Sequence, residues 1–297
     1  MSKNVLLFLL LAIILSILIF LQSHTGSQFQ KQSHRLQVAT SFYPLYFLAS
    51  RIAGDKAKVR NITPAGAEPH DYEPTVSDIA WIEQSKLLII NGAHLEVWYE
   101  KIKDQLQAYN VYVVMASEDS STNRDPHVWL SPPLAKKEVA RIIEGFIKVD
   151  PENTRYYQKN GKELLAQLDD LDMDYRKGLS YCQKNDIITS HNSFGYTAKT
   201  YGFHQISLIG ISPDAEPSVQ QLAQITQFAK KKKINYIFFE TLVSPELSKT
   251  LAQEVGAQTL VLDPIEGISQ EDMKKGKNYF TIMRSNLTNL RTALECK

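Results

Sequence analysis

Short apolar runs alternate along this chain with longer segments that have helical periodicity, and this alternation constrains the fold more than any other feature. A first strand is expected near Leu36–Thr40, and the apolar runs that follow are Leu87–Ile90, Val111–Val114, Ile187–Thr189, Tyr236–Phe239 and Thr259–Leu262. Short, continuous apolar runs are typical of strands buried on both faces. Helical segments between such strands are typical of parallel sheets covered by helices. The pattern therefore predicts an α/β fold with mainly parallel sheets.

One segment departs from the alternation. Between Pro151 and about Leu179 the only helix-breaking residue before Gly178, near the end of the segment, is Gly161. Apolar residues recur every three or four positions, at Tyr157, Leu164, Leu168, Leu171, Tyr175 and Leu179. This spacing predicts one long amphipathic helix. Because it falls midway in a chain of 297 residues, longer than one average domain, it is interpreted as a link between two lobes. The predicted division is an N-terminal lobe at 36–150, a linking helix at 151–181 and a C-terminal lobe at 182–297.

The N-terminus carries an apolar stretch from Val5 to Leu21, preceded by Lys3 and interrupted only by Ser16. Seventeen residues would span about 26 Å as a helix, near the short limit for crossing a bilayer. Residues 1–21 are therefore predicted to be an export signal or an N-terminal membrane anchor, with cleavage and retention both open. The polar residues 22–35 predict a flexible tether. Either way, the globular part is expected outside the cytoplasm, in the periplasm or at the outer face of the membrane.

Cysteine usage is sparse. Cys182 and Cys296 are the only thiols, so no cysteine directly after the apolar stretch could carry a lipid, and the chain is not expected to be a lipoprotein. The chain has no Cys-x-x-Cys spacing, so a thiolate metal site is not expected. In an oxidising compartment the two cysteines could pair if the fold brings them together, and the sequence leaves this open.

The overall charge argues against nucleic acid as a partner. Thirty-three basic residues against thirty-two acidic ones leave a formal net charge of +1. The run Lys230–Lys233 is interpreted as the end of a helix that begins near Ser218, where cations complement the helix dipole.

Four side chains with metal-binding chemistry follow strands or lie in loops. His70 and His127 each lie shortly before an expected helix, His191 follows the strand Ile187–Thr189, and Asp263 follows the strand Thr259–Leu262. Each alone is more typical of a turn or a solvated loop. If two lobes face each other, however, three imidazoles and one carboxylate converge, which suits a tetrahedral zinc ion.

Several stretches resemble the family of zinc and manganese solute-binding proteins of ABC importers. They occur in the family's order and are Thr40–Leu45, Pro69–Pro74, Asp125–Leu130, Ser190–Tyr196 and Glu216–Ser218. The resemblance covers about residues 36–295 and implies two α/β lobes joined by one long helix. It also implies metal ligands at His70, His127, His191 and Asp263. The expected partners are a divalent metal ion and a membrane permease with its ATPase, and the expected state is a monomer.

The third ligand indicates the metal. Members that resemble manganese receptors tend to carry Glu where this chain has His191, and a nitrogen-rich site favours zinc. Zinc is therefore the expected cargo, with manganese the alternative. The family's zinc members often carry a His-rich loop before the second ligand. In this chain the corresponding loop, residues 116–124, is short and contains no histidine. Glu68 and Glu240 are candidates to orient ligating histidines, and His94 has no assigned role.

The expected function is metal capture for uptake, without catalysis. A zinc hydrolase is disfavoured because there is no His-Glu-x-x-His motif, and a fourth protein ligand would close the coordination position that catalysis requires. A metal-containing surface adhesin is the third alternative, and no sequence feature supports it specifically.

Overall fold

The computed structural model describes residue 16 and residues 35–117, 125–213 and 217–297. The predicted signal or anchor and the tether lie outside the described residues, apart from Ser16 and Arg35. No helix in the described part of the chain is long and apolar enough to cross a membrane. The chain divides by its contacts into Met1–Arg35 and Leu36–Lys297, and the second of these units is described below.

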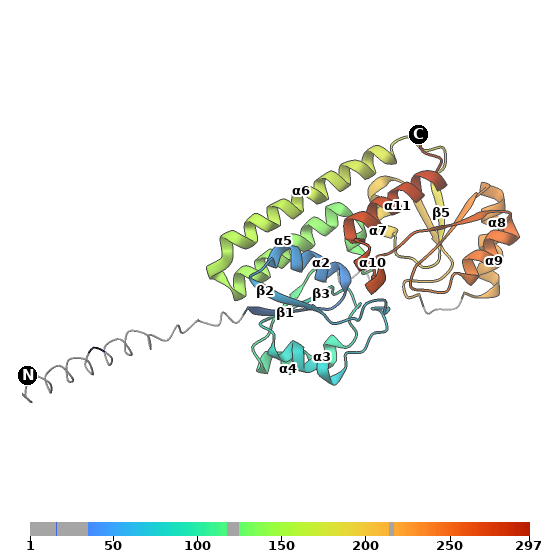
Figure 1. Cartoon of the computed structure of the whole chain (residues 1–297). Helices are drawn as coiled ribbons and strands as arrows, with labels where there is room; N and C mark the ends of the chain where they lie inside the picture. Colours follow the sequence, from blue (N-terminus) through green and yellow to red (C-terminus); the bar gives the residue numbers. More distant parts are fainter. Residues whose placement is uncertain (1–15, 17–34, 118–124, 214–216) are drawn as a thin grey trace, which may run out of the picture. The chain divides into compact units, whose positions relative to one another are not determined.

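Two four-stranded sheets, both entirely parallel, form the framework of this unit. The first has the order β2-β1-β3-β4 and the second the order β6-β5-β7-β8. The strands are β1 Leu36–Thr40, β2 Ala57–Asn61, β3 Leu87–Ile90, β4 Tyr112–Met115, β5 Asp186–Thr189, β6 His204–Ser207, β7 Tyr236–Phe239 and β8 Gln258–Val261. The predicted α/β class with parallel sheets is confirmed, and the two sheets repeat one topology (Figure 1).

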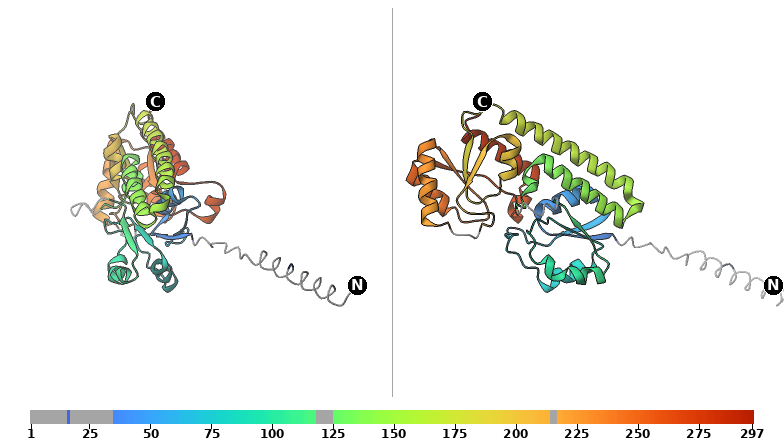
Figure 2. Two further views of the ribbon diagram at one scale, coloured as in Figure 1. Left: turned by 90° about the vertical axis from the view of Figure 1, so that its left-hand side faces the viewer. Right: turned by 180° about the vertical axis from the view of Figure 1, so that it is seen from behind.

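Helices connect these strands and cover the sheets. They are α2 Tyr43–Ala53, α3 Val76–Gln84, α4 Tyr99–Ala108, α5 Pro132–Val149, α6 Thr154–Gly178, α7 Gly195–Tyr201, α8 Val219–Lys232, α9 Glu246–Val255, α10 Gln270–Lys274 and α11 Tyr279–Ala293. Two short 3-10 turns, η1 Val128–Leu130 and η2 Pro151–Asn153, precede α5 and α6. In the first sheet α3 and α4 lie on one face, and α2, α5 and α6 lie on the other (Figures 1 and 2).

The central strand β3 shows why this arrangement is stable. All four of its residues are buried, and successive side chains point to opposite faces. Leu87 and Ile89 join the core under α2 and α5, whereas Leu88 and Ile90 join the core under α3 and α4. The continuous apolar run in the sequence is thus the signature of a strand covered on both sides.

Two strands, β2 and β6, were not expected from the sequence. Both are edge strands, and most of their residues are only partly buried. The edge strands β4 and β8 are also partly exposed but lie in apolar runs, whereas β2 and β6 carry mostly polar residues and lack the run by which a strand is recognised.

The predicted long helix is present as α6, with 25 residues from Thr154 to Gly178. Its buried face contains the apolar residues that define the expected stripe. Gly161 faces α5, where an added Cβ would lie 2.2 Å from Ile143 Cδ1. The missing side chain therefore lets these two helices pack closely.

The packing of the last helix, α11, departs from a simple division into two lobes. Although α11 belongs to the predicted C-terminal lobe, Tyr279 and Phe280 at its start pack on Phe47 of α2, with ring centroids 5.8 and 5.7 Å apart. One core cluster runs from Val38 to Leu294 and includes residues of both sheets. The lobe boundary at residue 182 stays a prediction. The last helix packs against α2 of the first sheet, so the C-terminal segment is not confined to the second sheet.

Cys182 and Cys296 form a disulfide, the alternative that the sequence left open. The two residues also form an isolated antiparallel bridge just after α6 and after α11. The bond thus closes a loop of 114 residues that contains the whole second sheet.

Removing this disulfide is expected to lower the free energy of unfolding by about 2–5 kcal/mol, since a cross-link over a long loop restricts the unfolded chain. The measurement is denaturant unfolding of the metal-free protein and of the Cys182→Ser/Cys296→Ser variant. Comparing the wild type with and without a reductant provides a control, because the reduced wild type should match the variant. Equal stability of all forms would contradict the prediction.

Candidate metal site

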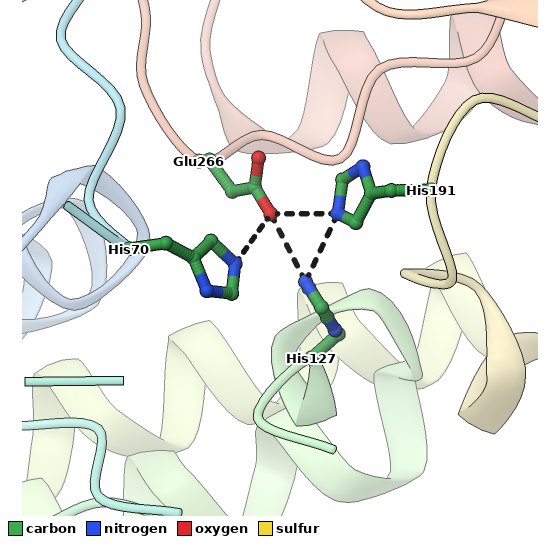
Figure 3. A group of neighbouring side chains, drawn as sticks. All are labelled: His70, His127, His191 and Glu266. Carbon is green, nitrogen blue, oxygen red and sulfur yellow. Dashed lines mark hydrogen bonds and ion pairs between the residues drawn. The ribbon is translucent and has the colours of Figure 1, made fainter. Parts of the chain in front are cut away.

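Four side chains from distant parts of the sequence meet at the carboxyl ends of the strands. His70 lies in the loop after β2, His127 after β4, His191 after β5 and Glu266 after β8. In parallel sheets the loops at this edge face a common space. Figure 3 shows the three imidazoles pointing toward the carboxylate of Glu266.

The donor atoms in this group lie close together. Oε1 of Glu266 is 3.3 Å from Nε2 of His70, 3.0 Å from Nε2 of His127 and 3.2 Å from Nε2 of His191. The Nε2 atoms of His127 and His191 are 3.3 Å apart. One ligand atom from each of the four residues lies within 4.8 Å of all the others.

These spacings fit a tetrahedral metal ion. Ligand atoms about 2.0–2.1 Å from zinc in a tetrahedron lie roughly 3.3 Å from one another. Four of the six separations, at 3.0–3.3 Å, are close to this value, and all six lie within 4.8 Å. Oε2 of Glu266 is buried and has no hydrogen-bond partner within the described part of the chain, which leaves this oxygen available to a cation.

Two outer carboxylates orient the buried imidazoles. Nδ1 of His127 lies 2.8 Å from Oδ1 of Asp125, and Nδ1 of His191 lies 2.6 Å from Oε2 of Glu240. A carboxylate accepts, so each Nδ1 carries the hydrogen and each Nε2 is directed at the centre of the group. Glu240 also accepts a hydrogen bond from the backbone N–H of His191, at 3.1 Å. Glu240 thus lies where the sequence analysis expected an orienting residue.

The charges around this group shift the pKa values of its histidines and of Glu266 in opposite directions. Burial opposes the charged form of His191, but contacts with Glu240 and Glu266 outweigh it and raise the pKa of His191 to about 10. Burial also opposes protonation of His127, and its contacts with Asp125 and Glu266 raise the pKa of this ring as well. Burial acts against ionisation of Glu266, yet hydrogen bonds from the three histidines hold the pKa of its carboxyl well below the usual value. The charges of this group thus favour a positive charge where its donor atoms meet.

The fourth predicted ligand needs correction, because Asp263 is not a member of this group. Its Oδ1 accepts a hydrogen bond from the backbone N–H of Ile265 at 2.8 Å, and its Oδ2 accepts one from Thr241 Oγ1 at 3.1 Å. Burial raises the pKa of Asp263 to about 6, although both hydrogen bonds favour the ionised form. The carboxylate is directed into its own loop, and Glu266, three residues later, takes the fourth position.

Glu266 was missed because no local pattern distinguishes it. Asp263 comes directly at the expected strand end, whereas Glu266 lies further along in Pro264–Gly267. The only available signal was a second carboxylate in the same loop, which should have been named beside Asp263.

Glu68 contacts the ligand loop in a different way from the one expected. Its Oε1 accepts from the backbone N–H of His70, at 3.3 Å, rather than from the imidazole ring. Burial, followed by the negative charge of Glu266, raises the pKa of Glu68 to about 8. Glu68 therefore supports the backbone of this loop. His94 is exposed and does not belong to it.

A cavity of about 450 Å³ lies beside Glu266, and the three histidines do not line it. Its wall includes Lys58 and Arg60, both within 5.3 Å of the Trp81 ring centroid. Two cations at this wall disfavour a metal ion in the cavity, and of the four donor residues only Glu266 lines it.

Known proteins are similar to this chain in both sequence and fold. The family model described as zinc-uptake complex component A, periplasmic (ZnuA), matches residues 38–293. The high-affinity zinc uptake system protein ZnuA of Bacillus subtilis is 39% identical over 295 residues, which cover 93% of this chain and 92% of that protein. The zinc-binding lipoprotein AdcA of Streptococcus pneumoniae is 36% identical over 88% of this chain, which spans only 56% of that protein's length.

Solved structures agree with these matches. The Zn(II)-bound ZnuA-like domain of S. pneumoniae AdcA has a TM-score of 0.79 and 37% identity, covering 88% of this chain and 99% of that domain. The laminin-binding protein Lmb of Streptococcus agalactiae, described as having adhesin and metal-transporting activity, has a TM-score of 0.80 and 32% identity, covering 87% of this chain and 99% of that protein. With the family model matching most of the chain, and with this sheet topology and donor group, the protein belongs to the ZnuA family of zinc-uptake components.

Proposed function

We propose that this protein captures zinc outside the cytoplasmic membrane and delivers it to the membrane permease of an ABC importer. The proposed ligands are His70, His127, His191 and Glu266. The observation that carries the proposal is the convergence of their four donor atoms within 4.8 Å, three of them fully or almost fully buried. The names of the relatives, which concern zinc uptake and zinc binding, support the same cargo.

The composition of the donor set favours zinc over manganese. Three imidazole nitrogens and one carboxylate are the ligand types that zinc prefers, whereas manganese favours more oxygen donors. Four protein donors also fill a tetrahedral site, which supports binding rather than hydrolysis, because catalytic zinc keeps an open position.

Delivery to a permease fits a protein that binds its cargo and releases it unchanged. The family description as periplasmic fits the predicted export signal or anchor at residues 1–21. Absence of an N-terminal lipid stays a prediction, although AdcA is named a lipoprotein. The expected monomeric state is part of the same proposal.

Competitive titration of the metal-free protein with zinc and manganese in a chelator buffer tests the proposal. One zinc per chain with nanomolar or tighter affinity, about −12 kcal/mol, is expected, with manganese much weaker. Comparable manganese affinity would change the cargo to manganese or both metals. Absence of tight binding of either metal would overturn the proposal.

Replacement of Glu240 by alanine is expected to weaken zinc binding by about 10–100-fold, because a ligating imidazole loses the group that orients it. Glu246→Ala is the matched control, since Glu246 is an exposed glutamate on α9 that pairs with Lys249. Zinc affinity of both variants is measured by chelator competition. An equal effect of the two substitutions would show that Glu240 has no orienting role.

A further inference from the structure

We propose that Asp263 is a positioning residue for Glu266, and that it acts by holding the intervening Ile265 in a left-handed backbone conformation. This inference rests on the proposed function, because it concerns one of the four proposed ligands. The residue that looks like a ligand in the sequence would thus determine whether the actual fourth donor reaches the metal.

Ile265 has an unusual backbone conformation directly before Glu266. Its φ is +59°, in the region where a side chain branched at Cβ is disfavoured. The side chain of Ile265 is fully buried in the core. A strained residue of this kind persists only where its surroundings determine it, and such residues cluster at functional sites.

The side chain of Asp263 is the first contact that holds Ile265 in this conformation. Its Oδ1 accepts a hydrogen bond from the N–H of Ile265, two residues later, at 2.8 Å. Aspartate favours this local turn, in which the carboxylate replaces a backbone carbonyl as the acceptor. The turn fixes the direction of the chain immediately before Glu266.

Neighbouring elements hold the ends of the same turn. Asn286 of α11 is buried and bonds to Asp263 in both directions, since its Oδ1 accepts from the backbone N–H at 2.9 Å and its Nδ2 donates to the carbonyl at 2.7 Å. Nε1 of Trp129 donates to the carbonyl of Pro264 at 2.7 Å. Trp129 lies two residues after His127, so this bond joins the loops that carry two of the proposed ligands.

The chain is also confined just after Glu266. An added Cβ at Gly267 would lie 3.2 Å from the carbonyl oxygen of Ala67 and 3.1 Å from Leu242 Cδ1. The backbone on both sides of Glu266 is therefore held in place. Loss of the Asp263 turn would let Ile265 relax to an ordinary conformation, which would turn the Glu266 carboxylate away from the histidines.

A double-mutant cycle tests whether Asp263 acts through Glu266. Zinc affinity is measured by chelator competition for the wild type, Asp263→Ala, Glu266→Ala and the double variant. Asp263→Ala alone is expected to weaken binding by about 10–100-fold, the usual effect of losing an orienting group. In the Glu266→Ala background the same change should alter affinity by no more than about twofold, because the donor that it positions is already absent.

Two single variants separate positioning from general stability. Asp263→Asn keeps an acceptor for the N–H of Ile265 and should restore binding to within about twofold of the wild type. Thr241→Val removes the other side-chain hydrogen bond of Asp263 and should leave zinc affinity unchanged. If Asp263→Ala does not fold, the cycle is run with Asp263→Ser, whose hydroxyl supports the turn more weakly.

The outcomes are distinguishable from those of the proposed function. Failure of the wild type to bind zinc would overturn the proposed function. If the wild type binds zinc but Asp263→Ala has the same effect with and without Glu266, or if Asp263→Asn is as damaging as Asp263→Ala, the positioning role is overturned.

Discussion

Replacing His191 with alanine is expected to weaken zinc binding by more than about 100-fold, because even loss of a group that only orients a ligand costs about 10–100-fold. Its Nε2 lies 3.2 Å from Glu266 Oε1 and 3.3 Å from His127 Nε2, so removal leaves a gap in the middle of the donor group. The ring is fully buried, and apart from His70 and His127, which are themselves proposed ligands, no described histidine belongs to the donor group.

The measurement is zinc affinity by chelator competition, together with thermal unfolding of the metal-free variant. His94→Ala is the control, since His94 is exposed and outside the donor group. A stability measurement is needed because His191→Ala leaves the buried Glu240 without its imidazole partner. A folded His191→Ala protein with wild-type zinc affinity would remove His191 from the proposed ligand set.

Zinc affinity is expected to rise steeply with pH between about 6.5 and 9, by about tenfold per pH unit for each proton that the metal displaces. The pKa of His191 in the metal-free protein is about 10, raised by Glu240 and Glu266 against the opposing effect of burial. Zinc binds the Nε2 atom of His191 only when that atom carries no proton. Between about pH 6.5 and 9, zinc binding must therefore displace a proton from the ring.

Whereas zinc affinity should rise with pH, the stability of the metal-free protein should fall as the pH rises. Because the folded pKa of His191 lies above the ordinary value of about 6.5, its ion pairs stabilise the fold fully below pH 6.5. That stabilisation is lost as the pH rises toward about 10. Zinc should therefore raise the unfolding temperature most at alkaline pH, where metal-free protein is weakest and zinc binding is strongest.

Calorimetric titration in buffers of different ionisation enthalpy measures the protons released. At pH 7.5 at least one proton per zinc is expected, and the number should fall as the pH approaches 10. His94→Ala should release as many protons as the wild type. Zinc affinity that does not change between pH 6.5 and 9 would contradict the raised pKa of His191.

The strands that the sequence predicted and those that it missed differ in the polarity of their residues. The strands β1, β3, β4, β5, β7 and β8 were expected to within about one residue, and the long helix was expected from the stripe that α6 buries. The edge strands β2 and β6 carry too few apolar residues to form a recognisable run, whereas β4 and β8 are edge strands as well but lie in apolar runs. Hydrophobic patterning thus reveals a strand only where the strand keeps an apolar run.

Helix starts differ in how far their caps are visible in the sequence. Thr75-x-x-Asp78 forms a capping box, since Thr75 and Asp78 exchange side-chain and backbone hydrogen bonds. Ser131 precedes α5 in the same way, but its hydroxyl pairs with Thr200 instead of capping the helix. A cap that depends on neighbours in sequence can be predicted, whereas a tertiary partner for the same side chain cannot.

By itself the sequence determined the α/β class, the long helix and the three histidines placed at strand ends, because these follow from local periodicity and from the common direction of parallel strands. Only the tertiary structure decided that Glu266 and not Asp263 completes the donor group, and that Cys182 bonds to Cys296. In the loop after β8 both carboxylates are close in sequence, and the choice depends on the left-handed turn at Ile265. The Asp263 side chain forms that turn locally, but its ends are held by contacts with α11 and Trp129, which are distant in sequence, so the sequence alone did not reveal which carboxylate reaches the histidines.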